Sequence, residues 1–257
     1  MKDTHTQLLK DKVALVTGSS RGIGAQIARL FAQHGANVVV HGRDIPTLAA
    51  VHAEIEWNGG SAIHVVADTT KLHEIDAMRR QIEQQLGPVD ILVANAGGSY
   101  AMPGPLENID EDGWRISIDG NLTATFLTIK SFLPGMKERR QGSIVTTSSA
   151  AARRAHPGTP IPYAAAKAGI IMMTQHLAAQ AGPFNIRVNC IAPETILTEN
   201  NRERIPEALQ ATLAEAHPLR RLGTVEDVAQ AALYLASDNA GWVTGVVLDV
   251  AGGAVMT

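Results

Sequence analysis

The chain has 257 residues, of which 45% are hydrophobic and 18% are charged, and its formal net charge is −3 with an isoelectric point near 6.3. This apolar content supports a sizeable core and excludes global disorder. The chain has no basic run and no interleaving of basic with aromatic residues, so we expect no nucleic-acid partner.

Neither a disulfide nor a metal centre is expected. Cys190 is the only cysteine, and the nine His residues do not occur at ligand spacing. The N-terminal residues are polar and lack the core of a signal peptide, and no apolar run approaches the roughly 18 residues that a membrane helix needs. We therefore expect a soluble, cytoplasmic protein without a membrane partner.

Short apolar runs alternate with longer amphipathic ones along the chain. In chain order we predict strand Val13–Thr17, helix Ile23–His34, strand Asn37–Val40, helix Pro46–Trp57, strand Ala62–Val66, helix Lys71–Leu86, strand Ile91–Ala94, helix Glu111–Glu138, strand Ser143–Thr147, helix Tyr163–Ala181, strand Arg187–Ile191, helix Val225–Ala236 and strand Val246–Val250. The helix Glu111–Glu138 is expected to bend near Pro134.

The strands are continuous and rich in Val and Ile, which is typical of parallel strands buried on both faces. Their alternation with helices predicts a single doubly wound α/β domain, with about seven parallel strands and helices on both faces. We assign residues 1–10 to a flexible N-terminus and residues 11–257 to the domain. Thr195–Leu222 is a polar insertion that contains the helix-forming stretch Glu207–Glu215, and we favour a lid over a surface excursion without a role.

A glycine-rich segment, Thr17–Gly24, joins the first strand to the first helix with the spacing Gly-x-x-x-Gly-x-Gly. Its glycines permit a tight turn and a close approach by a pyrophosphate, and the helix N-terminus supplies free N–H groups and a partial positive charge. In this position of an α/β pattern the segment predicts a dinucleotide-binding loop. A glycine-rich connection without a ligand is the alternative.

Tyr163 and Lys167 are four residues apart in a predicted helix, so their side chains share a face. A cation about 6 Å from a phenol is expected to lower the phenol pKa from about 10 toward the range useful for general acid–base catalysis. This spacing alone also occurs by chance on solvated helix faces.

Together these features resemble the short-chain dehydrogenase/reductase family, over essentially the whole chain after the first ten residues. The resemblance implies a Rossmann fold, a homotetramer, and a catalytic tetrad of Asn121, Ser149, Tyr163 and Lys167. The cofactor-binding residues that it implies are Gly18, Ser20, Arg21, Ile23, Gly24, Arg43, Asp68, Thr69, Asn95, Ala96, Gly97, Tyr163, Lys167, Pro193, Ile196 and Thr198.

The resemblance also implies a role for each member of the tetrad. Tyr163 exchanges a proton with the carbonyl oxygen while a nicotinamide cofactor transfers hydride, and Ser149 polarises the carbonyl. Lys167 lowers the Tyr163 pKa and holds the nicotinamide ribose. Asn121 helps to place a water that links Lys167 to solvent. Strand alternation is expected to point Ser148 to the opposite side.

The second strand indicates which cofactor is used. In the family an acidic residue at its end binds the ribose of NAD, but the matching position here is Gly42, followed by Arg43. With Arg21 as a second cation, we predict NADP(H) rather than NAD(H). Asp44 is the counter-argument, because a shifted loop could bring it to the ribose. An NAD-dependent alcohol dehydrogenase of the same family and a cofactor-binding regulatory protein without turnover therefore remain alternatives.

Two departures from the family lie near the expected substrate, which is a small carbonyl or alcohol compound. Glu194 replaces the Gly that commonly follows Pro193, and the interval from Ser149 to Tyr163 is one residue longer than usual. A 3-oxoacyl thioester reductase and a small ketone or sugar reductase both stay open. The expected substrate lining is Gly98, Ser99, Tyr100, Arg153, Arg154, Thr159, Ile161, Glu194 and lid residues up to Arg204.

Overall fold

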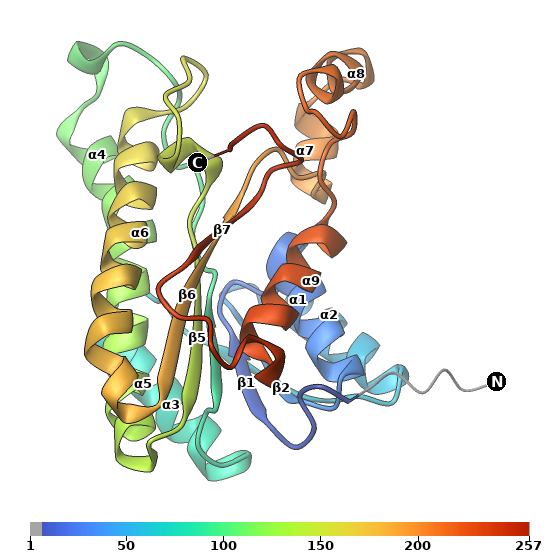
Figure 1. Cartoon of the computed structure of the whole chain (residues 1–257), viewed down its shortest axis with the longest axis vertical. Coiled ribbons are helices and arrows are strands. Elements are labelled where there is room, and N and C mark those ends of the chain that lie inside the picture. The colour runs from blue at the N-terminus through green and yellow to red at the C-terminus, as the bar shows by residue number, and fades with distance from the viewer. Residues whose placement is uncertain (1–6, 257) are drawn as a thin grey trace.

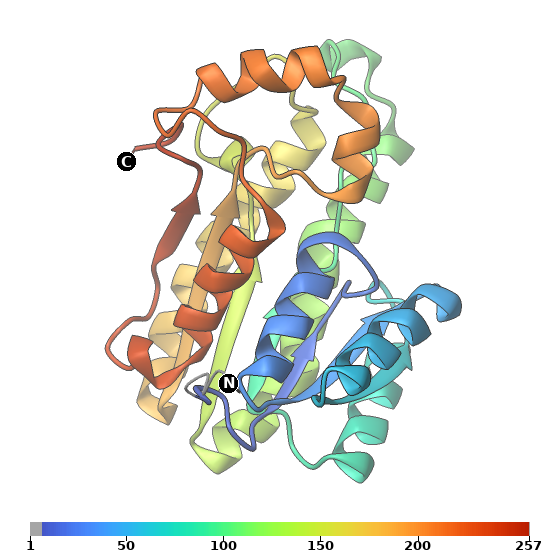
Figure 2. The same cartoon turned by 90° about the vertical axis from the view of Figure 1, so that its right-hand side faces the viewer.

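The computed structural model describes residues 7–256. They form one parallel sheet with helices on both faces (Figures 1 and 2). The strands are β1 (Val13–Val16), β2 (Asn37–Gly42), β3 (Ser61–Val66), β4 (Ile91–Ala94), β5 (Gly142–Thr147), β6 (Ile186–Pro193) and β7 (Val247–Val250). Their spatial order is β3-β2-β1-β4-β5-β6-β7, and every neighbouring pair is parallel. The order reverses between β1 and β4, the point at which such sheets bind ligands beyond the carboxyl ends of the strands.

The helices form two layers. They are α1 (Gly22–Gln33), α2 (Ile45–Trp57), α3 (Leu72–Gln85), α4 (Glu111–Ile118), α5 (Ala124–Arg139), α6 (Ile161–Ala181), α7 (Glu199–Arg204), α8 (Glu207–Glu215) and α9 (Val225–Ala236). Figure 1 shows α1, α2 and α9 on one face of the sheet and α3, α5 and α6 on the other.

Each strand contributes alternate residues to two separate cores. Ala14 and Val16 of β1 lie in the cluster with α1, α2 and α9, whereas Val13 and Leu15 lie in the cluster with α3, α5 and α6. Because successive side chains point to opposite faces, a strand covered on both sides must be apolar throughout. The predicted fold class, a doubly wound α/β domain with a seven-stranded parallel sheet, is confirmed.

The long helix predicted over Glu111–Glu138 is interrupted, but not where the bend was expected. Helix α5 continues through Pro134, whereas residues Asp119–Thr123 form a π-helical turn between α4 and α5. The side chain of Asn121 supports this turn, because its Nδ2 donates to the Ser117 carbonyl at 2.8 Å. The interruption at Asp119–Thr123 was not predicted, and the expected bend near Pro134 stays a prediction.

The segment predicted to be a flexible N-terminus is ordered in its described part. Residues 1–6 lie outside the described residues, but residues 7–10 lead into a turn in which Leu9 is only 1% exposed. The Leu9 N–H donates to the His34 carbonyl at 2.9 Å, so this turn is joined to the end of α1. Leu9, although it lies in a largely polar stretch of sequence, therefore belongs to the apolar core that contains α1.

The insertion Thr195–Leu222 carries α7 and α8 and lies beyond the carboxyl ends of the strands (Figure 2). The predicted helix-forming stretch Glu207–Glu215 coincides with α8. The two ends of the insertion are held together, because the Leu197 N–H donates to the Gly223 carbonyl at 2.8 Å and the Gly223 N–H donates to the Thr195 carbonyl at 3.1 Å.

Candidate functional site

A cavity of about 500 Å³ lies at the carboxyl ends of the strands, next to the point where the strand order reverses. Every residue predicted to contact a cofactor lines it, together with Ser149. Asn121 does not line the cavity; it is fully buried behind Gly120 and Gly98, which do. Sequence reasoning therefore selected residues from distant parts of the chain that the fold brings to one cavity.

The glycine-rich loop has a shape that only glycine permits at two positions. Gly18 has φ of +66°, and a Cβ there would lie 2.9 Å from Ala96 Cα. A Cβ on Gly24 would lie 2.3 Å from the Gly18 carbonyl oxygen. The N-cap residue of α1, Arg21, makes no capping side-chain hydrogen bond. The first N–H groups of α1 have no helical partners, and Ile23 and Gly24 of this first turn line the cavity, which suits an anionic group.

His41 is a component of the cavity that sequence reasoning missed. Its Nδ1 accepts from the Gly18 N–H at 3.2 Å, and its Nε2 lies 3.1 Å from the Ala67 carbonyl. Burial lowers the pKa of His41 to about 4. The hydrogen bond to the Ala67 carbonyl acts to raise this pKa but is outweighed. The ring is therefore neutral at pH 7 and links the glycine loop to the end of β3. Its only sequence signal is a polar residue inside an apolar strand.

The end of the cavity beyond β2 is lined by two arginines. The last residue of β2 is a glycine and so contributes no carboxylate. Gly42, Arg43 and Arg21 line this end. Asp44, which could compete with a phosphate, caps α2 instead: its Oδ1 accepts from the backbone N–H and from the hydroxyl of Thr47, both at 3.0 Å. These hydrogen bonds lower the pKa of Asp44 and fix its carboxylate on the helix.

Asp68 lies at the next strand end and is engaged locally. Its Oδ1 accepts from the Thr70 N–H at 3.0 Å and from the Thr70 hydroxyl at 2.8 Å. Across the cavity, Asn95 donates from Nδ2 to the Thr17 and Gly18 carbonyls at 3.1 and 3.3 Å. The Asn95 contacts hold the end of β4 against the glycine loop, whereas the Asp68 contacts are confined to the turn that follows β3.

Tyr163 and Lys167 lie on α6 at the inner end of the cavity. The Lys167 Nζ is 5.6 Å from the Tyr163 ring centroid and donates to the Thr147 carbonyl at 2.9 Å. The Ser149 side chain lies beside the Tyr163 phenol and, through a hydrogen bond, acts to lower its pKa. Ser149 caps the short turn Ala150–Ala152, and its Oγ accepts from the Ala151 N–H at 3.2 Å. Two hydroxyl groups and one ammonium therefore converge within one polar corner.

The predicted lowering of the Tyr163 pKa is wrong for this structure. Burial raises the pKa of the phenol, and the hydrogen bond with Ser149 opposes that shift only in part. Burial also lowers the pKa of Lys167 to about 8. The helix-spacing argument omitted desolvation, which acts on both groups, and it did not foresee that the ammonium would donate to the Thr147 carbonyl.

Asn121 has its hydrogen-bonding groups satisfied, as predicted for a buried amide. Its Oδ1 accepts from the Gly98 N–H at 3.1 Å, and its Nδ2 donates to the Gly98 carbonyl at 2.9 Å. Ser148, the hydroxyl expected to point away, donates to the Lys167 backbone carbonyl at 2.7 Å and is therefore occupied. Ser149 remains the serine whose side chain lies beside the Tyr163 phenol.

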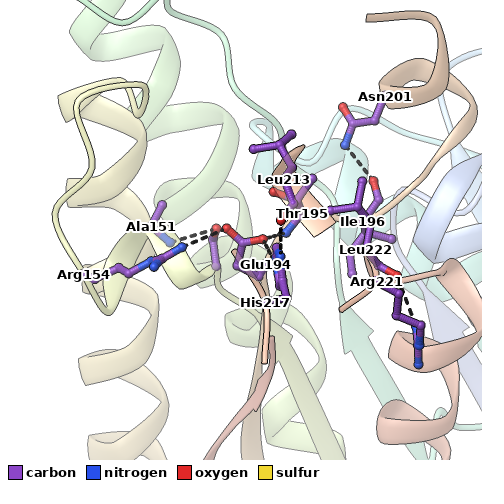
Figure 3. A network of polar contacts seen from close by, with 11 residues as sticks. Ala151, Arg154, Glu194, Thr195, Ile196, Asn201, Leu213, His217, Arg221 and Leu222 are labelled. Carbon is purple, nitrogen blue, oxygen red and sulfur yellow. Dashed lines mark hydrogen bonds and ion pairs between the residues drawn. The ribbon is translucent and has the colours of Figure 1, made fainter. Parts of the chain in front are cut away.

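The expected substrate end contains a second phenol and a carboxylate. The Tyr100 ring lies against the backbone of Gly120, where a Cβ would be only 2.4 Å from the ring. Glu194 lines the cavity, but its carboxylate binds Arg154 and His217 (Figure 3). Arg153 is paired with Asp249 through two contacts of 3.2 Å. The arginines near this end are therefore engaged with carboxylates.

Within residues 7–256, no helix is both long and apolar enough to cross a bilayer. In the described part of the chain, no group of three His, Cys, Asp or Glu side chains could hold a metal ion.

Known proteins are similar to this chain over nearly its whole length, including all residues that line the cavity. A family model described as Enoyl-(Acyl carrier protein) reductase matches residues 18–255. The 3-oxoacyl-[acyl-carrier-protein] reductase FabG of Chlamydia muridarum is 38% identical over 247 residues, which cover 96% of this chain and 98% of that protein.

Two solved structures show the same fold with different ligands. A 7α-hydroxysteroid dehydrogenase complexed with NADH and 7-oxo glycochenodeoxycholic acid has a TM-score of 0.92 and 35% identity, covering 100% of this chain and 99% of that one. A gluconate 5-dehydrogenase from Burkholderia cenocepacia in complex with NADP and tartrate has a TM-score of 0.90 and 32% identity, covering 97% of each chain. Similar chains thus bind either nicotinamide dinucleotide and differ widely in the second ligand.

Proposed function

Because the chain belongs to the short-chain dehydrogenase/reductase family, we propose that it is an NADP(H)-dependent oxidoreductase acting on a carbonyl or secondary-alcohol carbon. The observation that carries this proposal is the convergence of Tyr163, Ser149 and the buried Lys167 at the inner end of a cavity lined by the glycine loop, where the Ser149 side chain acts to lower the Tyr163 pKa. The glycine positions that exclude a Cβ and the free N–H groups of α1 fit a dinucleotide pyrophosphate.

The proposed chemistry needs one proton and one hydride. The bound nicotinamide supplies or accepts the hydride at the substrate carbon. In reduction, the Tyr163 hydroxyl gives its proton to the carbonyl oxygen. This proton neutralises the negative charge that hydride addition brings to that oxygen, so the product is a neutral alcohol. The Ser149 hydroxyl donates a hydrogen bond that orients and polarises that oxygen. In oxidation, Tyr163 takes the proton back from the alcohol.

Lys167 and Asn121 support this proton transfer in the proposal. The Lys167 ammonium is buried beside the phenol, where its charge favours the phenolate that forms during reduction. Lys167 would also hold the nicotinamide ribose hydroxyls. Asn121 keeps the π-helical turn in place, and its neighbours Gly98 and Gly120 line the cavity. We propose that it helps to order a water that links Lys167 to solvent.

The NADP(H) preference is supported by what surrounds the end of β2. Arg21 and Arg43 line the cavity, Gly42 carries no carboxylate, and the Asp44 carboxylate is fixed by Thr47. A guanidinium group presents a fork of donors that matches a 2′-phosphate. The ratio of kcat/KM for NADPH and NADH tests this assignment, and a clear preference for NADH would overturn it.

The substrate is sought with a panel assay. NADPH consumption is followed with 3-oxoacyl thioesters, small ketones, keto-sugars and oxo-steroids, each also in the alcohol direction. Turnover of any carbonyl that is lost in Tyr163→Phe supports the proposed oxidoreductase. Tight NADPH binding without turnover of any panel member would instead favour the cofactor-binding regulatory protein.

We also propose a homotetramer. Strand β7 is an edge of the sheet, its four residues are only half-buried, and Trp242 and Val246 beside it are 100% and 38% exposed. An edge strand with apolar neighbours is a surface that a second copy of the chain covers well. Light scattering at micromolar concentration tests this, and a monomer would count against it.

A further inference from the structure

Glu194 connects three parts of the cavity wall. It follows Pro193 at the end of β6, and its Oε1 accepts from the Arg154 guanidinium at 3.3 Å (Figure 3). Its Oε2 is 2.8 Å from His217 Nε2, and its carboxylate also accepts from the Thr195 N–H. Burial acts to raise the pKa of Glu194, but the hydrogen bonds from Thr195 and His217 outweigh it and lower the pKa. The carboxylate is therefore ionised and fully engaged, and it is not free to bind a cationic substrate.

His217 is held from both sides by oxygen acceptors. Its Nδ1 is 2.7 Å from the Leu213 carbonyl of α8, and its Nε2 faces the Glu194 carboxylate. Both ring nitrogens therefore face oxygen atoms, one from α8 and one from the residue that follows β6. The side chains of His217 and Glu194 are only 5% and 16% exposed, so this contact is screened from water.

The three partners belong to segments with different roles. Arg154 follows the turn that Ser149 caps, and its backbone N–H donates to the Ala150 carbonyl of that turn. Thr195 begins the insertion Thr195–Leu222, and His217 stands near its far end, directly after α8. One carboxylate thus ties the Ser149 turn to both ends of the insertion.

We propose that Glu194 is a positioning residue that holds the insertion over the cavity and fixes its distance from the Ser149 turn, so that the substrate carbonyl meets Ser149 only when the insertion is closed. This inference rests on the proposed oxidoreductase function. Glu194 acts through Arg154 and His217, and it touches none of the reacting atoms. The residue that departs from the common Pro-Gly of the family therefore has a defined structural task.

The first test separates substrate binding from cofactor binding. Glu194→Ala should raise KM for the carbonyl substrate about tenfold, the effect of losing a charge-assisted hydrogen bond, and change the Kd of NADPH less than about twofold. Glu194→Gln retains an acceptor for Arg154 and a donor for a neutral His217, so it should recover most of the lost KM.

A double-mutant cycle tests whether the pair acts as one unit. His217→Ala should raise KM as Glu194→Ala does, and the double variant should be no worse than either single variant. Arg221→Gln is the matched control, because Arg221 lies at the same end of the insertion but pairs with Asp227 of α9 at 2.6 Å, whereas His217 pairs with Glu194. Its KM should equal that of the unaltered protein.

A second measurement needs no turnover and so separates this inference from the proposed function. Trypsin cleavage after the exposed Arg202 and Arg204 of α7 reports local opening of the insertion. Glu194→Ala should accelerate it about tenfold at an unchanged unfolding midpoint, whereas Arg221→Gln should not. Unchanged cleavage and KM in Glu194→Ala, or equal effects in the control, would overturn the inference. Absence of turnover in the unaltered protein would overturn the proposed function alone.

Discussion

The Lys167 ammonium donates to the backbone carbonyl of Thr147 at 2.9 Å, while its centre of charge stays 5.6 Å from the Tyr163 ring. The lysine is thus anchored to the end of β5. Burial raises the pKa of that phenol and lowers the pKa of the lysine to about 8. Desolvation is the main cause of both shifts.

Tyr163→Phe should retain the fold and NADPH binding but lower kcat by about 10²–10⁴-fold, the usual contribution of a positioned general acid. The phenyl ring keeps the packing of Tyr163 on α6 while removing the phenolic hydroxyl, and with it the proton that the mechanism transfers. Single-turnover rates with a saturating substrate measure the change. A variant with unaltered kcat would show that another group supplies the proton.

Lys167→Met should abolish most activity and yet stabilise the protein at neutral pH, by on the order of 1–3 kcal/mol, because a buried ammonium is costly. The pKa of Lys167 is depressed to about 8 from 10.5, so the unfolded chain binds the proton more tightly. The unaltered protein therefore gains stability from this group as pH rises from about 8 to 10.5, and the advantage of the variant should shrink there. Urea unfolding at pH 7 and pH 10 measures both effects.

Gly42→Asp should convert the cofactor preference. A Cβ at position 42 meets its nearest neighbours, Leu48 and Ser20, at 3.4 Å, so a side chain fits without a clash. The new carboxylate would repel a 2′-phosphate and accept from a ribose hydroxyl. We expect kcat/KM to fall at least tenfold with NADPH and to rise with NADH. Arg43→Ala serves as the companion variant and should lower only the NADPH value.

His41 should make the protein sensitive to acid. Its pKa is lowered from 6.5 to about 4 in the folded state, so the stability that it contributes is complete above pH 6.5 and is lost as pH falls toward 4. His41→Gln retains an amide that can bond Gly18 and Ala67, and its stability should fall less over this window. Thermal unfolding at pH 7 and pH 4.5 provides the comparison. Equal losses in both proteins would contradict the role of His41.

Much of the fold could be predicted because burial on both faces makes each strand continuously apolar, as in Val38–Val40. The cofactor loop could also be predicted, since two of its glycines are required by contacts under 3 Å that any Cβ would make. In both cases one physical constraint restricts the residue types at several adjacent positions. The pattern is therefore visible in a short stretch of sequence.

Other features depend on contacts between distant residues and leave no local pattern. His41 bonds Gly18 and Ala67 from the middle of an apolar strand, and Glu194 finds His217 at a separation of 23 residues inside a polar insertion. The direction of the Tyr163 pKa also depended on desolvation, which spacing on a helix does not report. Glu194 could be noticed as a departure from the family, but its partners could not.

The π-helical turn at Asp119–Thr123 sets the rotational phase of everything after it. It holds one residue more than an α-helical turn, which shifts the following helix by about 100° around its axis. Ile129, Phe132 and Met136 of α5 face the core in the register that follows this turn. Deleting a single residue from the turn would rotate these three side chains toward solvent. The π-helical turn beside the cavity therefore also sets which face of α5 packs against the sheet.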